Sequence, residues 1–187
     1  MNTRIKRLVI ALLCVPAFQL LASLISPLYA DENIISGADN NLILTSSALV
    51  LLMTPGLAFF YGGFTQAKNV LNTMIMSIVM MGIATIVWLI FGFSLAFSDG
   101  ESLQAFIGNP LTYSFFENLP EVWPGLNIPG LSFALFQGMF AIITPALISG
   151  ALVERISFKF WCLFTPIWLL LVYSPLAHMV WGGGLLG

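Results

Sequence analysis

The chain has 187 residues, of which 59 % are hydrophobic and only 7 % are charged. A soluble domain carries about 25 % charged residues, so this composition leaves too little polar surface to face water and excludes a soluble globular domain. The formal net charge of −2 and the lack of a basic patch give no indication of nucleic-acid binding. The two cysteines, Cys14 and Cys162, lie far apart in apolar stretches and form neither a metal-ligand spacing nor a disulfide framework.

Residues 1–30 have the layout of a secretory signal peptide. Three cations within residues 4–7 precede an apolar run over residues 8–21, and Ala30 ends a segment that offers a cleavage site. An uncleaved first helix is the alternative, because the apolar run is long for a leader. We expect cleavage, which leaves residues 31–187 as one membrane domain.

Four uncharged apolar stretches follow, each judged against the roughly 20 residues that cross the hydrocarbon core of a bilayer. They run over about residues 42–62, 71–97, 131–153 and 161–176, and the last continues into a tail that ends at Trp181. The second and third stretches are joined by a longer acidic loop with several prolines, glycines and asparagines. The sequence therefore predicts an all-α, multi-pass membrane protein with four transmembrane helices in this chain.

The order of the charged residues predicts how these helices cross the membrane. Basic residues fall in alternate polar segments, namely the amino terminus, the loop with Lys68 and the loop with Arg155 and Lys159. Acidic residues fill the other segments, and Glu154 is the exception. Because lysine and arginine are held on the cytoplasmic side, the loops with Lys68 and Arg155 are predicted to lie inside and the acidic loop outside. The mature amino terminus then lies outside the cell membrane, as a cleaved leader requires.

The predicted spans lack the side chains that most membrane enzymes and pumps need. They contain no intramembrane carboxylate pair, proton relay or arginine ladder. The chain has one histidine, His178, whereas haem or iron–sulfur ligation needs more histidines or cysteines. We therefore expect no catalytic residue, no metal and no cofactor, and we do not expect an enzyme.

Two stripes run along the third predicted helix. The first stripe is Phe136, Phe140, Ile143 and Leu147, spaced i, i+4, i+7 and i+11 on one helix face. The second stripe consists of small residues, which let helix backbones approach closely in membranes: Ala134, Gly138, Ala141, Pro145 and Ser149. By spacing alone, the aromatic stripe is typical of a face that packs in a core or faces lipid.

Long motifs distributed over residues 40–187 carry more information than the periodicity does. They are Leu-Met-Thr-Pro-Gly-Leu-Ala-Phe-Phe-Tyr-Gly-Gly at 52–63, Lys-Asn-Val at 68–70, Phe-Gln-Gly-Met-Phe-Ala-Ile-Ile-Thr-Pro-Ala-Leu at 136–147, Gly-Ala-Leu-Val-Glu-Arg at 150–155 and Ala-His-Met-Val-Trp-Gly-Gly-Gly at 177–184. In this order they resemble the ammonium transporters of the Amt/Mep/Rh family. The resemblance implies a homotrimer with one pore per subunit, each subunit having eleven transmembrane helices in two inverted halves. This chain resembles about the first four of those helices.

The resemblance also implies a binding site. By motif position, Phe140 and Trp181 are similar to the aromatic wall of the outer ammonium site, and Phe136 lies close by. An aromatic face attracts a cation by roughly 0.5–2 kcal/mol. His178 precedes an extracellular loop and does not match the family's mid-pore histidines, so we expect it to be structural, capping the fourth helix or bonding a loop.

Three further residues match apolar pore-lining positions of the family, namely Leu57, Ile143 and Leu147. An apolar constriction rejects ions that would lose their hydration without compensation. The function implied is ammonium or ammonia transport through a hydrophobic pore. The implied partners are ammonium, the bilayer and a cytoplasmic regulatory protein of the signal-transduction type. A membrane-bound ammonium sensor and a non-functional truncated product remain as alternatives, because the resemblance covers only the amino-terminal portion of the family.

Overall fold

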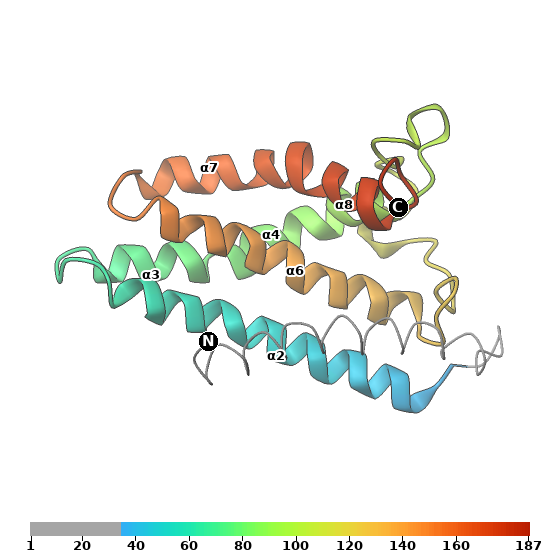
Figure 1. Ribbon diagram of the computed structural model, residues 1–187, viewed down its shortest axis with the longest axis horizontal. Coiled ribbons are helices and arrows are strands. Elements are labelled where there is room, and N and C mark those ends of the chain that lie inside the picture. The colour runs from blue at the N-terminus through green and yellow to red at the C-terminus, as the bar shows by residue number, and fades with distance from the viewer. Residues whose placement is uncertain (1–34) are drawn as a thin grey trace, which may run out of the picture.

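Four long apolar helices lie side by side in the computed structural model, which describes residues 35–187 (Figure 1). The first is α2 (Gly37–Gly62) and the third is α6 (Gly130–Ala151). The second is built from four consecutive segments, α3 (Val70–Ile78), α4 (Met80–Val87), η2 (Trp88–Gly92) and α5 (Phe93–Phe97). The fourth is built from α7 (Phe158–Trp168), η5 (Leu169–Tyr173) and α8 (Ser174–Trp181). Each is long and apolar enough to cross a membrane.

The four predicted transmembrane helices are confirmed, with ends that differ by a few residues. The first and fourth begin earlier than the apolar runs, because serine side chains cap their amino termini. The Ser36 hydroxyl accepts a hydrogen bond from the Asp39 backbone N–H at 3.2 Å, and Ser157 does the same for Phe160 at 3.3 Å. Apart from one isolated pairing of Val122 with Pro129, residues 35–187 form no β structure. The predicted signal peptide lies outside the described residues.

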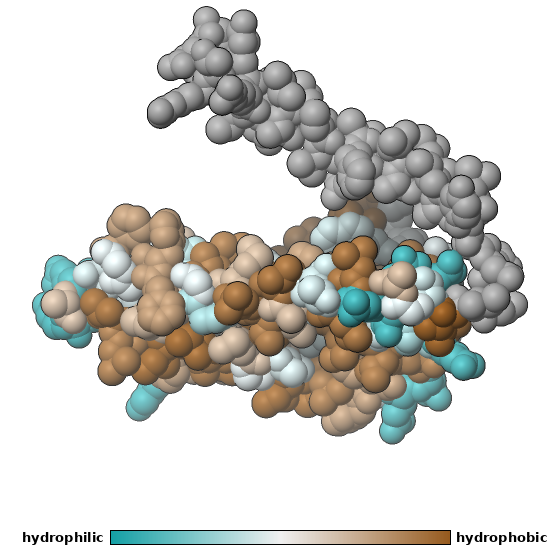
Figure 2. Space-filling view, turned by 90° about the horizontal axis from the view of Figure 1, so that it is seen from below, coloured by the Kyte–Doolittle hydropathy of each residue, from teal (hydrophilic) through white to brown (hydrophobic). Residues whose placement is uncertain are grey.

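The loops gather at two ends of the bundle. One end, here called the basic-loop end, carries the connections 63–69 and 152–157 (Figure 1). The other end, here called the acidic-loop end, carries the long connection 98–129, which contains the short 3₁₀ turns η3 (Glu101–Leu103) and η4 (Ser114–Phe116). Figure 2 shows apolar residues over the middle of the visible face and hydrophilic residues gathered toward both ends. This distribution is the one expected of a multi-pass membrane protein.

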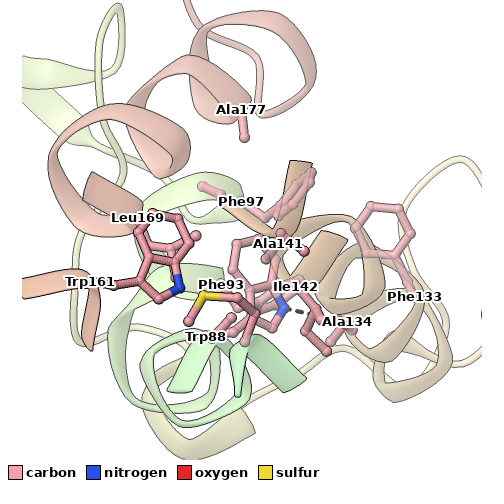
Figure 3. Close-up of a cluster of buried hydrophobic side chains, with 14 of the residues drawn as sticks. Trp88, Phe93, Phe97, Phe133, Ala134, Ala141, Ile142, Trp161, Leu169 and Ala177 are labelled. Atoms are coloured by element: carbon pink, nitrogen blue, oxygen red, sulfur yellow. Dashed lines mark hydrogen bonds between the residues drawn. The ribbon is translucent and has the colours of Figure 1, made fainter. Parts of the chain in front are cut away.

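The small-residue stripe of α6 packs against the second helix, as its composition predicts. Ala134 and Ala141 are fully buried, and a Cβ atom added at Gly138 would lie 3.0 Å from the Trp88 ring. The Trp88 indole N–H donates to the Ala134 carbonyl at 3.1 Å, a bond drawn as a dashed line in Figure 3. Near the basic-loop end, the Ser149 and Ser77 hydroxyls lie 3.0 Å apart. One face of α6 is therefore fixed along most of its length.

The second and fourth helices each contain one π-helical turn, η2 and η5, and the two turns are neighbours. The rings of Trp88 and Tyr173 meet edge-on there, with centroids 6.0 Å apart. A Cβ atom added at Gly92 would lie 2.9 Å from the Trp88 ring, so a glycine is needed at this close approach. The two π-helical turns thus lie at a close contact between the second and fourth helices.

Candidate functional site

An aromatic pocket of about 430 Å³ lies at the acidic-loop end of the bundle. Three helices and one loop form its wall, namely α5, α6, α8 and residues 123–126. The lining residues are Phe97, Trp123, Pro124, Gly125, Leu126, Phe133, Phe136, Gln137, Phe140 and Trp181. The pocket therefore combines segments that are far apart in the sequence, and it has no charged side chain in its lining.

Helix α6 contributes four side chains to the pocket, which follow one another at i, i+3, i+4 and i+7: Phe133, Phe136, Gln137 and Phe140. This spacing places them on one helix face. Phe136 and Phe140 meet edge to face, with ring centroids 5.0 Å apart and planes inclined by 87°. Both rings are only half-buried, so part of their surface remains available to a ligand. The aromatic stripe thus faces a pocket at this end of the helix.

The inner wall of the pocket is a stack of aromatic rings. Trp123 lies on Phe133 with centroids 4.2 Å apart and planes inclined by 15°, and Phe97 meets Phe133 edge-on at 5.1 Å. The buried Phe93 ring lies next to both, with centroids 5.3 Å from Phe97 and 6.3 Å from Phe133; Figure 3 labels these three residues within the buried cluster. A buried aromatic cluster of this kind holds the shape of the wall.

The loop that closes the pocket is held by backbone hydrogen bonds. Trp123 N–H donates to the Ile128 carbonyl at 2.9 Å, and Leu126 N–H donates to the Trp123 carbonyl at 3.0 Å. Gly125 turns the chain with a φ of 76°, which glycine adopts without strain. The Ser36 N–H bonds the Asn127 carbonyl at 2.9 Å, which ties the loop to the start of α2.

Trp181 ends α8 and reaches the pocket rim, where its side chain is 63 % exposed. Its helix is anchored by His178, which is fully buried. The imidazole Nδ1 lies 3.1 Å from the Ala96 carbonyl, and Nε2 lies 2.9 Å from the carbonyl of Gln104 in the long loop. The expectation that His178 bonds a loop is confirmed, and through these contacts the residue fixes the helix that carries Trp181.

The structure brings three of the six predicted site residues together, because Phe136, Phe140 and Trp181 all line the pocket. Leu57, Ile143 and Leu147 do not line it. Ile143 and Leu147 continue the α6 stripe toward the basic-loop end, where Ile143 is buried and Leu147 is half exposed.

Leu57 lies on α2, which packs directly against α6. At the basic-loop end, the Tyr61 hydroxyl donates to the Leu147 carbonyl at 3.3 Å, and Gly150 leaves room for the Tyr61 ring. These contacts hold α2 and α6 together beyond the pocket.

Sequence reasoning missed the other side chains of the pocket. The phase of α6 contains enough information to find Phe133 and Gln137, since they share a face with Phe136 and Phe140. No local pattern marks Phe97 or the loop residues, which reach the pocket only through tertiary packing.

The arrangement suits a cation with little hydration. Aromatic faces attract cations through their negative quadrupole, and an apolar wall excludes water from the ion. Within residues 35–187 no group of three His, Cys, Asp or Glu side chains lies close enough to hold a metal ion. The aromatic faces of the pocket are the feature that could attract a cation.

These features define a multi-pass helical membrane protein with an aromatic pocket at one end of its bundle. The family model described as the Ammonium Transporter Family matches residues 41–187, and the chain belongs to that family. An ammonium transporter of Aquifex aeolicus is 42 % identical over 159 residues, which cover 84 % of this chain and 37 % of that protein.

Solved structures of the same family also match. The crystal structure of Saccharomyces cerevisiae Mep2 has a TM-score of 0.71 and 32 % identity, covering 81 % of this chain and 34 % of that one. A structure titled "Sensor Amt Protein" has a TM-score of 0.68 and 27 % identity, covering 76 % of this chain and 34 % of that one. The chain thus spans about a third of the length of the relatives that it matches.

Proposed function

We propose that the protein containing this chain transports ammonium across the cell membrane and that it is not an enzyme. The observation that carries the proposal is the pocket in which Phe136, Phe140 and Trp181 present aromatic surface without any charged neighbour in the lining. Membership of the ammonium transporter family supports it, since the curated relative from Aquifex aeolicus is named an ammonium transporter.

In this proposal the pocket captures ammonium before it enters the pore. Contact with aromatic faces contributes about 0.5–2 kcal/mol and partly replaces the lost hydration of the ion. Loss of water lowers the pKa of ammonium, because desolvation disfavours the charged form. A proton is then released more readily before ammonia crosses the apolar path that begins along Ile143 and Leu147.

We also propose that the pocket faces the outside of the cell. The cations Lys68, Arg155 and Lys159 all belong to the basic-loop end, which the distribution of lysine and arginine assigns to the cytoplasm. Four acidic residues belong to the long loop at the pocket end: Asp99, Glu101, Glu117 and Glu121. Their negative charge raises the local concentration of cations near the pocket. A cleaved signal peptide ending at Ala30 fits this orientation.

The complete protein is further proposed to assemble as a homotrimer and to contact a cytoplasmic regulatory protein of the signal-transduction type. The family resemblance supports both statements. A second candidate function is ammonium sensing, which the similarity to the structure titled "Sensor Amt Protein" favours. A sensor needs a soluble signalling module, so the nucleotide sequence beyond codon 187 distinguishes a sensor, a transporter and a truncated product.

Growth complementation tests the transport function. In a strain lacking its own ammonium transporters, the complete gene product should restore growth on low ammonium at acid pH, where diffusible ammonia is scarce. Changing Phe140 and Trp181 together to alanine should abolish the rescue. Phe160→Ala is the matched control, since this exposed phenylalanine lies near the basic-loop end, away from the pocket. Rescue by the double variant at a normal membrane level contradicts the proposal.

A further inference from the structure

One polar side chain interrupts the apolar lining of the pocket. Gln137 lies on the pocket face of α6, one residue after Phe136 and three residues before Phe140. The other lining side chains are aromatic or aliphatic, apart from Gly125, which has none. The two indoles of the lining, Trp123 and Trp181, can donate a hydrogen bond but cannot accept one. Gln137 is therefore the only side chain in the lining with a strong hydrogen-bond acceptor.

Several polar side chains in the four helices have a hydrogen-bond partner within residues 35–187. Thr144 donates to the Phe140 carbonyl at 2.6 Å, and Thr165 donates to the Trp161 carbonyl at 2.9 Å. Three residues, Asn40, Thr54 and Ser174, bury an oxygen without a partner among the described residues, but none of them lines the pocket. Among these polar side chains, Gln137 is thus distinguished by its place on the pocket face.

No hydrogen bond joins the Gln137 side chain to any other part of residues 35–187, and the side chain is half-buried on the pocket face. Within residues 35–187 its amide oxygen is therefore available to accept a hydrogen bond from a ligand. Because Gln137 lies on the pocket face of α6, a ligand that enters the pocket can contact its side chain.

We propose that the side-chain oxygen of Gln137 accepts a hydrogen bond from the ammonium ion held against Phe140 and Trp181. This inference rests on the proposed function and adds a substrate contact to the same pocket. Aromatic faces attract positive charge but do not orient it. Ammonium directs its N–H bonds tetrahedrally, so an amide oxygen beside the rings takes one of them and replaces one hydrogen bond to water.

A neutral acceptor suits transport better than a carboxylate. Transport requires binding that is favourable enough for the ion to enter and weak enough for it to leave. An amide oxygen gives direction without a full opposing charge, whereas a carboxylate forms a stronger, charge-assisted hydrogen bond. Gln137→Glu should therefore bind ammonium more tightly and release it more slowly.

Uptake kinetics of radiolabelled methylammonium, with ammonium as competitor, test the inference in the complete gene product. Gln137→Met and Gln137→Leu should raise KM about tenfold, as loss of a hydrogen bond to a charged group implies, with little change in maximal rate. Gln137→Glu should lower both KM and the maximal rate. Gln66→Met is the matched control, because Gln66 is exposed in the loop 63–69 at the other end of the bundle.

The outcomes separate this inference from the function on which it rests. An unchanged KM in Gln137→Met, with wild-type transport intact, overturns the role of Gln137 and leaves ammonium transport standing. A raised KM in the Gln137→Glu variant also overturns the role of Gln137. If the apolar variants do not reach the membrane, the Gln137→Glu variant alone tests the inference. If the wild-type protein is present in the membrane and takes up no methylammonium or ammonium, both the inference and the proposed function are wrong.

Discussion

Replacing Trp88 with phenylalanine should destabilise the protein more than the same change at Trp123. Trp88 is 4 % exposed, and its indole N–H donates to the Ala134 carbonyl on α6 at 3.1 Å. The variant leaves that carbonyl without its side-chain partner and leaves a small void beside Gly138. The lost hydrogen bond contributes about 0.6–1.7 kcal/mol in a membrane helix bundle, and the void adds about 1 kcal/mol. We expect a total loss of about 2 kcal/mol.

The assay is reversible unfolding of the purified complete protein in mixed micelles, followed by far-ultraviolet circular dichroism because the substitutions remove fluorophores. Trp161→Phe should behave like Trp88→Phe, since the buried Trp161 indole donates to the Met76 carbonyl at 2.8 Å. Trp123→Phe should lose clearly less, because the Trp123 indole makes no hydrogen bond within residues 35–187 and its ring is only half-buried. The reasoning fails if Trp88→Phe destabilises the protein no more than Trp123→Phe.

Two further predictions concern the ends of the bundle. With the native cysteines removed, a cysteine introduced at the exposed Ser102 should react with an impermeant maleimide in intact cells. A cysteine introduced at the exposed Ala67 should react only after permeabilisation. Labelling at position 67 in intact cells would contradict the proposed orientation. At the basic-loop end, hydrogen bonds from the Asn69 side chain and the Gln66 backbone N–H lower the pKa of Glu154 from its ordinary value of 4.5. A lowered pKa means that this stabilisation is present above the ordinary pKa and is lost as pH falls through the lowered value. The wild-type protein should therefore lose more stability on acidification below about pH 4.5 than the Glu154→Ala variant does. The same unfolding assay measures both losses. Equal losses would show that the carboxylate does not hold the loop.

The sequence was sufficient to predict the helices because the bilayer imposes a simple length rule. An apolar run of about 20 residues without charge is long enough to span the membrane, and the four runs predicted the four helices. Their ends were less predictable, since a capping serine such as Ser36 or Ser157 extends a helix beyond the apolar run. The π-helical turns in the second and fourth helices have no comparable signal, because they depend on contacts between the two helices.

Part of the pocket could be predicted from the periodicity of one helix and from the motif resemblance. The phase of α6 places Phe136 and Phe140 on one face, and motif resemblance adds Trp181 from a distant segment. Trp123 and Phe97 were not predictable, because only the packing of the long loop against Phe133 brings them to the pocket. Side chains from a loop have no periodicity, so their contribution to a site appears only in three dimensions.

Glu154 is the acidic residue that the charge pattern leaves unexplained and that the structure explains. The distribution of cations assigns its loop to the basic-loop end, where an acidic residue is out of place. Its carboxylate accepts hydrogen bonds from the Gln66 N–H at 3.0 Å and from the Asn69 side chain at 2.9 Å, in the loop between α2 and α3. The exception to the charge pattern is therefore a structural contact that joins the two loops of that end.

Helix α6 connects the packing of the bundle to the geometry of the pocket. Its small-residue face is fixed against the second helix by the Trp88 bond to Ala134 and by the contact of Trp88 with Gly138. The neighbouring face carries Phe136, Gln137 and Phe140 into the pocket. Because both faces belong to one rigid helix, a rotation that relieved crowding at Gly138 would also turn the aromatic rings and Gln137 relative to Trp181. The close approach of α6 to the second helix thus sets the direction in which Phe136, Gln137 and Phe140 face the pocket, although none of the small residues of that stripe lines it.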